Sequence, residues 1–274
     1  MRIQAALVIL LGSATAAVAA PEVSVTPKTV HPGDPVLVTV RGEDHAPQGK
    51  VGATTLVFFP ARTDYQAVFA VPLDAKLGSL SIRIDGAAIP AAVTVEDKTF
   101  PETDVIVEDE LANPAKPERD RIDADNGAIV HAAKAKGAPQ FTRRLRRPPG
   151  EITSVFGEWR TFNDGHRSQH LGADFFAREG TRVRAIGSGT VALVRETFLA
   201  GNVVVVDHGA GIASAYYHLS KTSVKEGDTV RAGEELGRAG HTGRTTGPHL
   251  HLSVRVPGGF VDPIAFFALP IAPR

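Results

Sequence analysis

Alternation of apolar and polar residues dominates the first hundred positions of the chain. Short runs with apolar residues at every second position are separated by turn sequences such as Pro32-Gly33-Asp34 and Asp85-Gly86. The apolar members of these runs are Val23 and Val25; Val36, Val38 and Val40; Leu80, Ile82 and Ile84; and Val93 and Val95. A period of two is typical of strands with one buried face. Residues 20–98 are therefore predicted to form a small β-sandwich of about six or seven short strands.

The first 19 residues have the layout of an export signal. Arg2 gives a positive start, the run from Ile3 to Leu11 is nearly all apolar, and Ala17-Val18-Ala19 fits the small-x-small pattern of a cleavage site. The run is shorter than the roughly 20 residues that span a bilayer, so we expect cleavage after Ala19 rather than a retained membrane anchor. We expect an exported protein without stable membrane insertion. The sequence has no cell-wall anchor motif or wall-binding repeat, which favours the periplasm over the extracellular medium.

Residues 99–147 interrupt the strand pattern and are predicted to be a partly helical linker. Pro117 precedes a proline-free run up to Lys136, and Gly137 follows it, as at the boundaries of a helix. A basic run of four arginines, Arg143, Arg144, Arg146 and Arg147, comes next. We interpret this run as a solvated junction, with contact to acidic wall polymers as the alternative.

Residues 148–274 again show strand patterns and are predicted to form a second domain. The segment Glu179–Ala185 recurs as Glu226–Ala232, each with a glycine in the turn before its strand. Duplicated hairpins of this kind predict a folded-over antiparallel sheet. Biotinyl and lipoyl carrier domains have a related pattern but need an acceptor lysine, typically beside a methionine, and the chain has no such position. The predicted fold class is mainly β.

Composition narrows the possible chemistry. The chain of 274 residues carries 30 basic and 30 acidic residues, so no global positive field predicts nucleic acid as a partner. Cysteine is absent, which excludes a cysteine nucleophile, a thiolate metal site and disulfides. A metal site would have to be built from histidine, aspartate and glutamate.

Seven of the ten histidines lie between His166 and His251, and their spacing suggests a metal site. His249 and His251 form a His-x-His pair on a predicted strand, so both rings reach one face. His170 and Asp174 add an imidazole and a carboxylate. A catalytic zinc takes three such ligands and keeps one open position, so His170, Asp174 and one of the paired histidines would suffice. His218 ends another predicted strand and is suited to stabilising an oxyanion.

Other interpretations of these motifs are weaker. His166 and His170 have the i, i+4 spacing of zinc-binding helices, but residue 167 is arginine and Asn163-Asp164-Gly165 disfavours a helix. His166 is expected near the rim of the groove, and His208 is expected to be structural. The glycine-rich run from Gly240 to Gly247 lacks the Gly-Lys-Ser/Thr of a phosphate-binding loop.

Three ordered motifs resemble the lysostaphin-type (LytM) peptidoglycan metallopeptidases over roughly residues 150–267. The motifs are His170-Leu171-Gly172-Ala173-Asp174, Tyr217-His218-Leu219-Ser220 and Gly247-Pro248-His249-Leu250-His251. The resemblance implies that His170, Asp174 and His251 bind one Zn²⁺ per chain. It also implies that His249 acts as general base toward the attacking water and that His218 stabilises the transition state. Residues 20–98 resemble the immunoglobulin-like modules of exported bacterial proteins.

The resemblance implies a zinc endopeptidase that cuts the stem-peptide cross-links or bridge peptides of peptidoglycan. The alternative is a non-catalytic member that binds the wall and activates a partner amidase, but such a protein is expected to have lost metal ligands. A peptidase acting on a protein substrate is a further possibility. Residues 20–98 are expected to serve as a spacer or to bind a regulatory protein partner.

Overall fold

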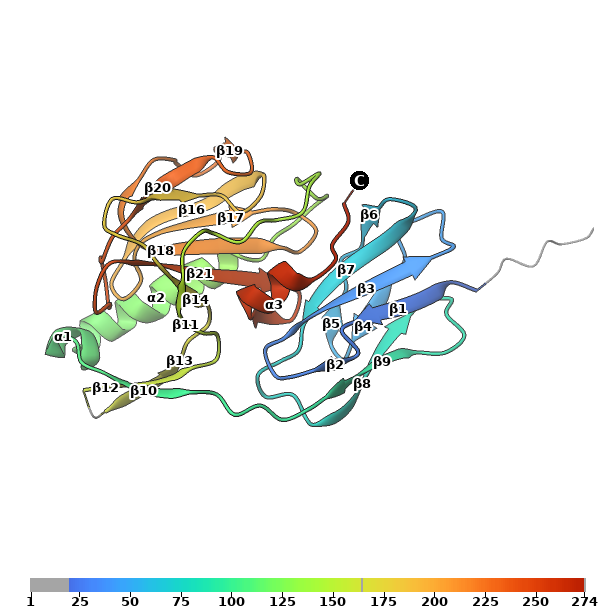
Figure 1. Cartoon of the computed structure of the whole chain (residues 1–274), viewed down its shortest axis with the longest axis horizontal. Helices are drawn as coiled ribbons and strands as arrows, with labels where there is room; N and C mark the ends of the chain where they lie inside the picture. The colour runs from blue at the N-terminus through green and yellow to red at the C-terminus, as the bar shows by residue number, and fades with distance from the viewer. Residues whose placement is uncertain (1–19, 164, 274) are drawn as a thin grey trace, which may run out of the picture.

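A computed structural model describes residues 20–163 and 165–273 of the chain. The expected export signal, residues 1–19, lies outside the described residues. The predicted mainly β class is confirmed, and Figure 1 shows two groups of sheets side by side, the N-terminal strands in blue and cyan and the C-terminal strands in yellow to red. No helix within the described ranges is long and apolar enough to cross a membrane.

Two sheets form the N-terminal part. The first has the order β1 (Glu22–Thr26), β3 (Pro35–Arg41), β7 (Asp64–Ala70), β6 (Phe59–Ala61). The second has the order β2 (Thr29–Val30), β9 (Ala91–Val95), β8 (Gly78–Ile84), β4 (Gly49–Val51), β5 (Thr54–Thr55). Their facing valines, isoleucines and leucines form one apolar cluster, as the period-two pattern predicts for a sandwich. The immunoglobulin-like assignment stays a prediction.

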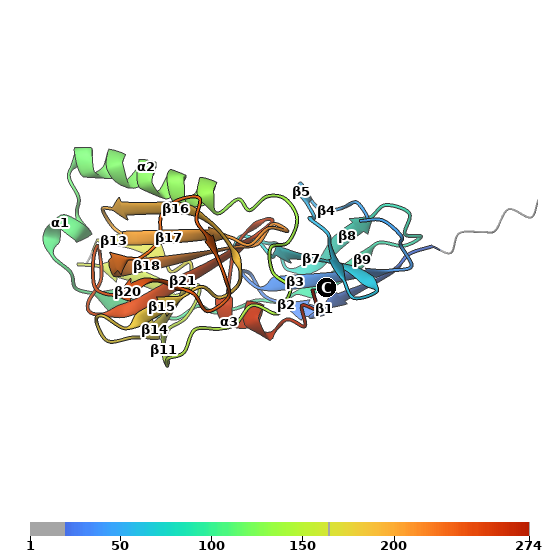
Figure 2. The ribbon, with the colours of Figure 1, turned by 90° about the horizontal axis from the view of Figure 1, so that it is seen from above.

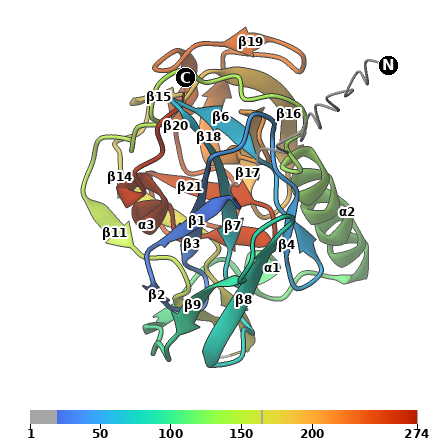
Figure 3. The same ribbon diagram turned by 90° about the vertical axis from the view of Figure 1, so that its right-hand side faces the viewer.

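The strands β3, β7 and β6 of the first sheet are largely buried on both faces. Val36, Val38 and Val40 of β3 point into the sandwich, whereas Leu37 of the same strand belongs to the core of the C-terminal domain. The ring of Phe59 on β6 packs edge-on against Phe141, with centroids 5.7 Å apart. Seen from the N-terminal side, the sandwich lies directly in front of the C-terminal sheet (Figure 3). The two parts therefore share an apolar core rather than a flexible joint.

Residues 99–147, expected to be a linker, pack along the C-terminal domain. β10 (Glu102–Val105) pairs in parallel with β12 (Trp159–Phe162). After the short α1 (Asp109–Ala112), helix α2 (Lys116–Ala132) begins beside Pro117, close to the predicted start. The helix runs along one face of the C-terminal sheet (Figure 2), where Ile129 and Ala133 contact apolar residues of that sheet.

The main C-terminal sheet is antiparallel and has ten strands. Its central path is β11 (Ile152–Ser154), β14 (Ala173–Phe176), β21 (His249–Val256), β18 (Ala213–Thr222), β17 (Gly201–Asp207), β16 (Gly189–Thr197), β19 (Thr229–Val230). Three strands pair beside this path: β15 (Arg182–Arg184), β20 (Glu235–Ala239) and β22 (Gly259–Val261). A short hairpin of β12 and β13 (His166–Gln169) and the helix α3 (Pro263–Ala268) complete the domain.

The predicted internal repeat corresponds to two similar pieces of this sheet. The repeated segments end in β15 and β19, each preceded by a glycine with positive φ, Gly180 at 79° and Gly227 at 86°. Such a φ is costly for residues with a β-carbon, which explains the glycine in both copies. β15 pairs with β20 and β19 pairs with β16, so the strands fold over the core.

Candidate metal centre

Sheet register brings the candidate ligands together. Asp174 on β14 lies opposite His251 on β21, and Tyr217 on β18 flanks His251 from the other side. His170 precedes β14. Its side chain reaches the same face of the sheet because the chain passes very close to β21 at Gly172. A β-carbon at Gly172 would lie 2.5 Å from the carbonyl oxygen of Leu252, closer than any real contact, so the position requires glycine.

Three ligand atoms converge within the distances expected around a small cation. His170 Nε2 lies 2.7 Å from His251 Nδ1 and 3.1 Å from Asp174 Oδ1, and His251 Nδ1 lies 2.9 Å from the same oxygen. Only 6% of His170 and 5% of Asp174 is exposed. A buried cluster of two imidazoles and one carboxylate has the N/O donor set of a catalytic zinc.

The outer nitrogens of the two ligand histidines are held by hydrogen bonds. His170 Nδ1 donates to the carbonyl oxygen of Val155 at 2.8 Å. His251 Nε2 lies 3.0 Å from Ser253 Oγ, which donates onward to the carbonyl oxygen of Leu171 at 2.7 Å. These bonds assign the protons to the outer nitrogens and leave a lone pair on each inner nitrogen.

The three inner lone-pair donors therefore fit a metal ion. Acceptors that face one another at 2.7–3.1 Å repel unless a cation or a shared proton lies among them. Burial acts to raise the pKa of the Asp174 carboxyl, but its polar contacts with His170 and His251 lower it well below its usual range. The carboxylate is thus ionised and available as a ligand at neutral pH.

A second set of polar side chains holds the other oxygen of Asp174. Arg160 Nη2 donates to Asp174 Oδ2 at 2.7 Å, and Arg160 Nε donates to Glu158 Oε2 at 3.0 Å. Ser154 hydrogen-bonds to both Arg160 and Glu158, and Thr103 of β10 donates to Glu158 Oε1 at 2.7 Å. Burial acts to raise the pKa of Glu158, but these hydrogen bonds lower it overall. The network connects the Asp174 carboxylate to β10, in the segment before the C-terminal domain.

His249 lies beside the cluster without joining it. Its Nδ1 donates to the carbonyl oxygen of Gly247 at 2.8 Å, which leaves the lone pair on Nε2. That nitrogen is buried, has no hydrogen-bond partner among the described residues and lies 3.6 Å from Asp174 Oδ1. A histidine held in this tautomer next to a metal site can accept a proton.

His218 faces the same space from β18. Its backbone has the unusual φ of 59°, and its Nδ1 donates to the carbonyl oxygen of Thr242 at 2.8 Å. The ring centroid lies 4.9 Å from that of His249. Burial, with the neighbouring His249 and His251 as further causes, lowers the pKa of His218 to about 3. Neutral His218 therefore presents a lone pair on Nε2 and becomes a donor there only after it gains a proton.

Two cavities of about 450 and 390 Å³ flank the cluster. Both are lined by Arg160, Phe162 and Arg244, and the guanidinium of Arg244 lies 3.8 Å from the ring centroid of Phe162. β10 lines one cavity and α2 lines the other. The groove over the cluster is therefore walled in part by residues 99–147.

The structure thus brings all five predicted site residues together and places the other histidines elsewhere. His166 is exposed on β13, and His241 lies 3.4 Å from Glu179 at the surface. His208 is fully buried, and its nitrogens lie 2.8 Å from the carbonyl oxygen of Ser188 and the hydroxyl of Ser214. This environment is structural, as expected.

Four contributors to the site were not predicted: Ser253, Arg160, Glu158 and the carbonyl group of Thr242. Ser253 follows His249 and His251 at the same period of two, so the strand pattern could have indicated it. The contacts of the other three depend on the tertiary fold, and no local pattern marks them.

A β-sheet domain with a buried His/Asp/His cluster and two further histidines beside it is the arrangement expected of a metallopeptidase. Residues 168–263 match the model of peptidase family M23, so the similarity covers the C-terminal domain that carries the site. The predicted resemblance is confirmed.

Curated relatives agree with this assignment. The peptidoglycan DD-endopeptidase ShyA of Vibrio cholerae is 46% identical over 89 residues, which are 32% of this chain and 21% of ShyA. The DD-carboxypeptidase/endopeptidase Mpg of Neisseria meningitidis is 44% identical over 101 residues, which are 37% of this chain and 23% of Mpg. The chain therefore spans between a fifth and a quarter of the length of these two relatives.

A solved structure extends the similarity beyond the metallopeptidase domain. The crystal structure of a Pseudomonas aeruginosa protein assigned to peptidase M23 superposes with a TM-score of 0.66 and 28% identity. The match covers 86% of this chain and 94% of the other. Coverage of this extent includes residues outside 168–263, so the similar fold is larger than the family domain.

Proposed function

We propose that the protein is an exported, zinc-dependent endopeptidase that hydrolyses peptide cross-links of bacterial peptidoglycan. The observation that carries this proposal is that the histidines of the site fall into two groups with different roles. His170 and His251 direct lone pairs at one point together with Asp174, whereas His249 keeps a buried nitrogen beside them that has no partner in the described part of the chain. The cluster fits a metal ion, and His249 fits a proton acceptor.

One Zn²⁺ held by His170, Asp174 and His251 would polarise the scissile carbonyl and make a water molecule more acidic. His249 Nε2 takes the proton of the attacking water, because its Nδ1 is already committed to Gly247. His218 stabilises the developing oxyanion once it carries a proton on Nε2. Negative charge nearby raises the pKa of His218 and favours that protonated form.

The proposed substrate rests on the relatives and on the groove. ShyA is named a peptidoglycan DD-endopeptidase, and Mpg is named a DD-carboxypeptidase/endopeptidase. The two cavities beside the metal site leave room for a peptide on either side of the scissile bond. A stem-peptide cross-link or a bridge peptide meets this requirement. Export to the periplasm follows from the signal pattern of residues 1–19 and from the location of such a substrate.

A regulatory partner that binds residues 20–98 would have a restricted choice of surface. The outer face of the first sheet is buried against the C-terminal domain through Leu37, Phe59 and Val68. The outer residues of β8 and β9 are largely exposed. We propose that any such partner contacts this second sheet.

Digestion of purified peptidoglycan tests the proposed function. Wild-type protein, His249→Ala and chelator-treated protein are incubated with peptidoglycan, and the muropeptides are separated and weighed by mass spectrometry. We expect loss of cross-linked dimers with the wild type only. Binding of the wall without cleavage by the metal-loaded wild type would instead support the amidase-activator alternative, and cleavage of an unstructured protein alone would support a general peptidase.

A further inference from the structure

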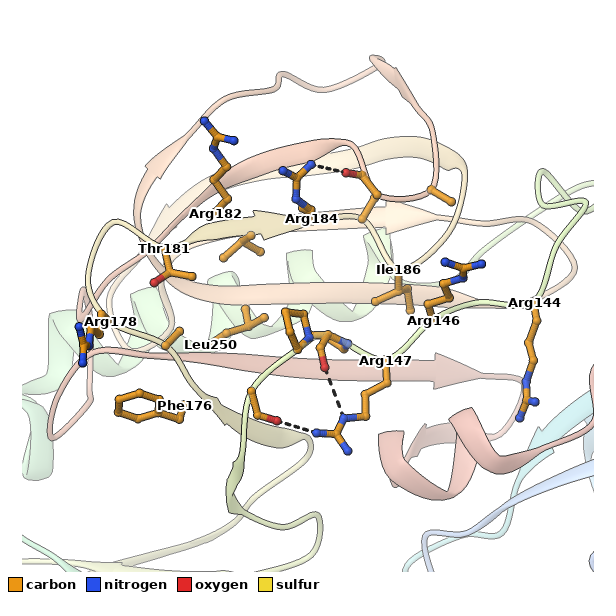
Figure 4. A pocket seen from close by; sticks show the side chains of 18 of the residues that line it. Arg144, Arg146, Arg147, Phe176, Arg178, Thr181, Arg182, Arg184, Ile186 and Leu250 are labelled. Atoms are coloured by element: carbon orange, nitrogen blue, oxygen red, sulfur yellow. Dashed lines mark hydrogen bonds between the residues drawn. The ribbon is translucent and has the colours of Figure 1, made fainter.

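A cavity of about 660 Å³ lies between residues 143–150 and the β14–β15 connection, apart from the metal centre (Figure 4). None of the five site residues lines it. Leu250 lines it from β21, between His249 and His251. Because neighbouring residues of a strand point to opposite faces, this cavity lies behind the face that carries the metal cluster.

Seven arginines and no acidic residue line this cavity, which we call the arginine pocket. Arg143, Arg144, Arg146 and Arg147 come from the basic run of the sequence. Arg178, Arg182 and Arg184 come from the β14–β15 connection and from β15. In a chain with equal numbers of basic and acidic residues, this is a strong local excess of positive charge.

Most of this charge is uncompensated. Arg182 pairs with Glu235 at 3.3 Å, and the other six arginines have no carboxylate partner among the described residues. The side chains of Arg143, Arg146 and Arg178 make no hydrogen bond or ion pair within the described part of the chain. Like charges gathered without counter-charges repel, and an anionic ligand would relieve that repulsion.

Three of the guanidinium groups are held by backbone carbonyl oxygens while keeping donors free, and Arg144 is one of them, donating to the carbonyl oxygen of Phe267. Arg147 donates to the carbonyl oxygen of Gly150 at 2.5 Å and lies over the ring of Phe175. Arg184 donates to the carbonyl oxygen of Gly233 at 2.7 Å. Each guanidinium has five N–H donors, so several remain for a ligand, and fixed donors lose less entropy when a ligand binds.

The apolar floor of the pocket and the spacing of its arginines indicate the kind of anion that it would bind. Apolar residues, among them Pro149, Val183 and Leu250, line the pocket between the charges. Figure 4 shows Arg178 at one end and Arg144 at the other. A ligand that fits both features is an extended chain with several anionic groups and small apolar groups. Carboxylate-bearing stem peptides rich in alanine have this chemistry, whereas polyol phosphate chains lack the apolar part.

The pocket shares no lining residue with the two cavities at the metal centre among the described residues, but both are built on β14 and β21. Gly180 donates its backbone N–H to the carbonyl oxygen of Ala239 at 2.9 Å, just before the loop that leads to His249. Phe176, which lines the pocket, lies opposite His249 in the sheet register. A wall segment bound in the pocket would therefore lie on the other side of β14 and β21 from a cross-link in the groove. Two linked contacts raise the effective affinity for a polymer.

We propose that the arginine pocket is a second peptidoglycan-binding site that recognises the carboxylates of an uncleaved stem peptide. This inference rests on the proposed function, because the ligand is taken to come from the same polymer as the substrate. Recognition by paired guanidinium and carboxylate groups predicts binding that weakens as salt rises.

Binding of uncross-linked stem peptides to chelator-treated full-length protein tests the proposal without requiring cleavage. The probes are a stem tripeptide with free carboxylates, the same peptide with its carboxylates amidated, and inorganic polyphosphate. The variant is Arg146→Gln/Arg178→Gln, because neither arginine side chain has a hydrogen-bond or ion-pair partner within residues 20–163 and 165–273. The matched control is Arg83→Gln on the exposed face of β8.

We expect the double variant to bind the free-carboxylate peptide at least about tenfold more weakly than the wild type, with the control unchanged. The amidated peptide should bind weakly to every protein. Equal affinity of the double variant and the wild type, or equal affinity for the amidated peptide, would overturn the proposal. Tight binding of polyphosphate without peptide binding would overturn it too and would indicate a phosphate polymer.

The catalytic proposal and the pocket proposal can fail independently of each other. If the metal-loaded wild type does not cleave cross-linked dimers but the double variant loses peptide binding, the pocket stands as a wall-binding site and the enzyme assignment falls. If dimers are cleaved and the double variant binds like the wild type, the pocket proposal alone falls.

Discussion

Arg160 is not among the candidate metal ligands, but it orients one of them, Asp174. Its guanidinium fixes Oδ2 of Asp174, so the carboxylate keeps Oδ1 directed at the two histidines. Glu158 fixes the guanidinium in turn. Groups of this kind orient ligands and commonly change metal affinity when they are removed.

Replacing Arg160 should therefore weaken metal binding before it affects the fold. We expect Arg160→Ala to lower zinc affinity about tenfold to a hundredfold, and Arg160→Lys to recover part of the loss. Competition with a fluorescent chelator measures both affinities. Arg167→Gln, an exposed position on the same hairpin, is the control and should bind zinc like the wild type. Unchanged affinity in Arg160→Ala would show that Asp174 does not depend on this contact.

His208 gives a pH-dependent contribution to stability. Complete burial lowers its pKa from 6.5 to about 4, so the folded state holds it neutral while the unfolded state is protonated below pH 6.5. Its stabilising contribution is present above pH 6.5 and is lost as the pH falls from 6.5 to about 4. The shift corresponds to about 3 kcal/mol over that window.

We expect His208→Asn to unfold with a flatter pH dependence than the wild type. Chemical unfolding of both proteins in chelator, at several pH values between 4 and 7, measures the difference. The comparison cancels the contributions of His218 and His251, whose pKa values are also lowered by burial. Parallel pH curves for the two proteins would contradict the assignment.

At the scale of elements, strand periodicity explains how much of the site was predictable. His249 and His251 share a face because they are two residues apart on β21, and the sequence pattern indicates that directly. The helix α2 was likewise indicated by Pro117 and the run that follows. The pairing of β10 with β12 and the contact of Arg160 with Asp174 join segments far apart in the chain. Local patterns carry no signal for such contacts, so the role of residues 99–147 as a wall of the groove could not be predicted.

Asp125 anchors α2 to the sheet. It is 3% exposed, pairs with Arg195 at 2.9 Å and accepts a hydrogen bond from the backbone N–H of Phe198 at 3.1 Å. We expect Asp125→Ala to destabilise the protein by about 2 kcal/mol, less than a fully buried pair, because Arg195 is partly exposed. Urea unfolding measures this. Asp123→Ala, exposed on the same helix, should change stability little, and equal effects of the two variants would contradict the anchoring role.

At the scale of the whole molecule, the two domains share one apolar core. Leu37, Phe59 and Val68 of the sandwich join the core cluster of the metallopeptidase domain. The backbone adds cross-domain hydrogen bonds, from Ala70 N–H to the carbonyl oxygen of Pro257 and from Asp262 N–H to that of Gly33, both 2.9 Å. An interface of this kind favours cooperative unfolding over independent domain motion.

We therefore expect one unfolding transition for the full chain. The single tryptophan, Trp159, reports on the C-terminal domain by fluorescence, and circular dichroism reports on all strands. The two thermal curves should coincide, and Leu37→Ala should shift both together, at a cost of about 2–4 kcal/mol. Separate transitions, with Leu37→Ala affecting only one of them, would show that the domains unfold independently.

The central claim is that His170, Asp174 and His251 hold the metal whereas His249 moves the proton. Zinc content and cleavage of a cross-linked muropeptide dimer, measured side by side in the wild type, His249→Ala and His251→Ala, test it most directly. We predict one zinc per chain in the wild type and in His249→Ala, loss of zinc in His251→Ala, and cleavage by the wild type alone. Cleavage by metal-loaded His249→Ala at the wild-type rate, or full zinc retention in His251→Ala, would contradict the assignment.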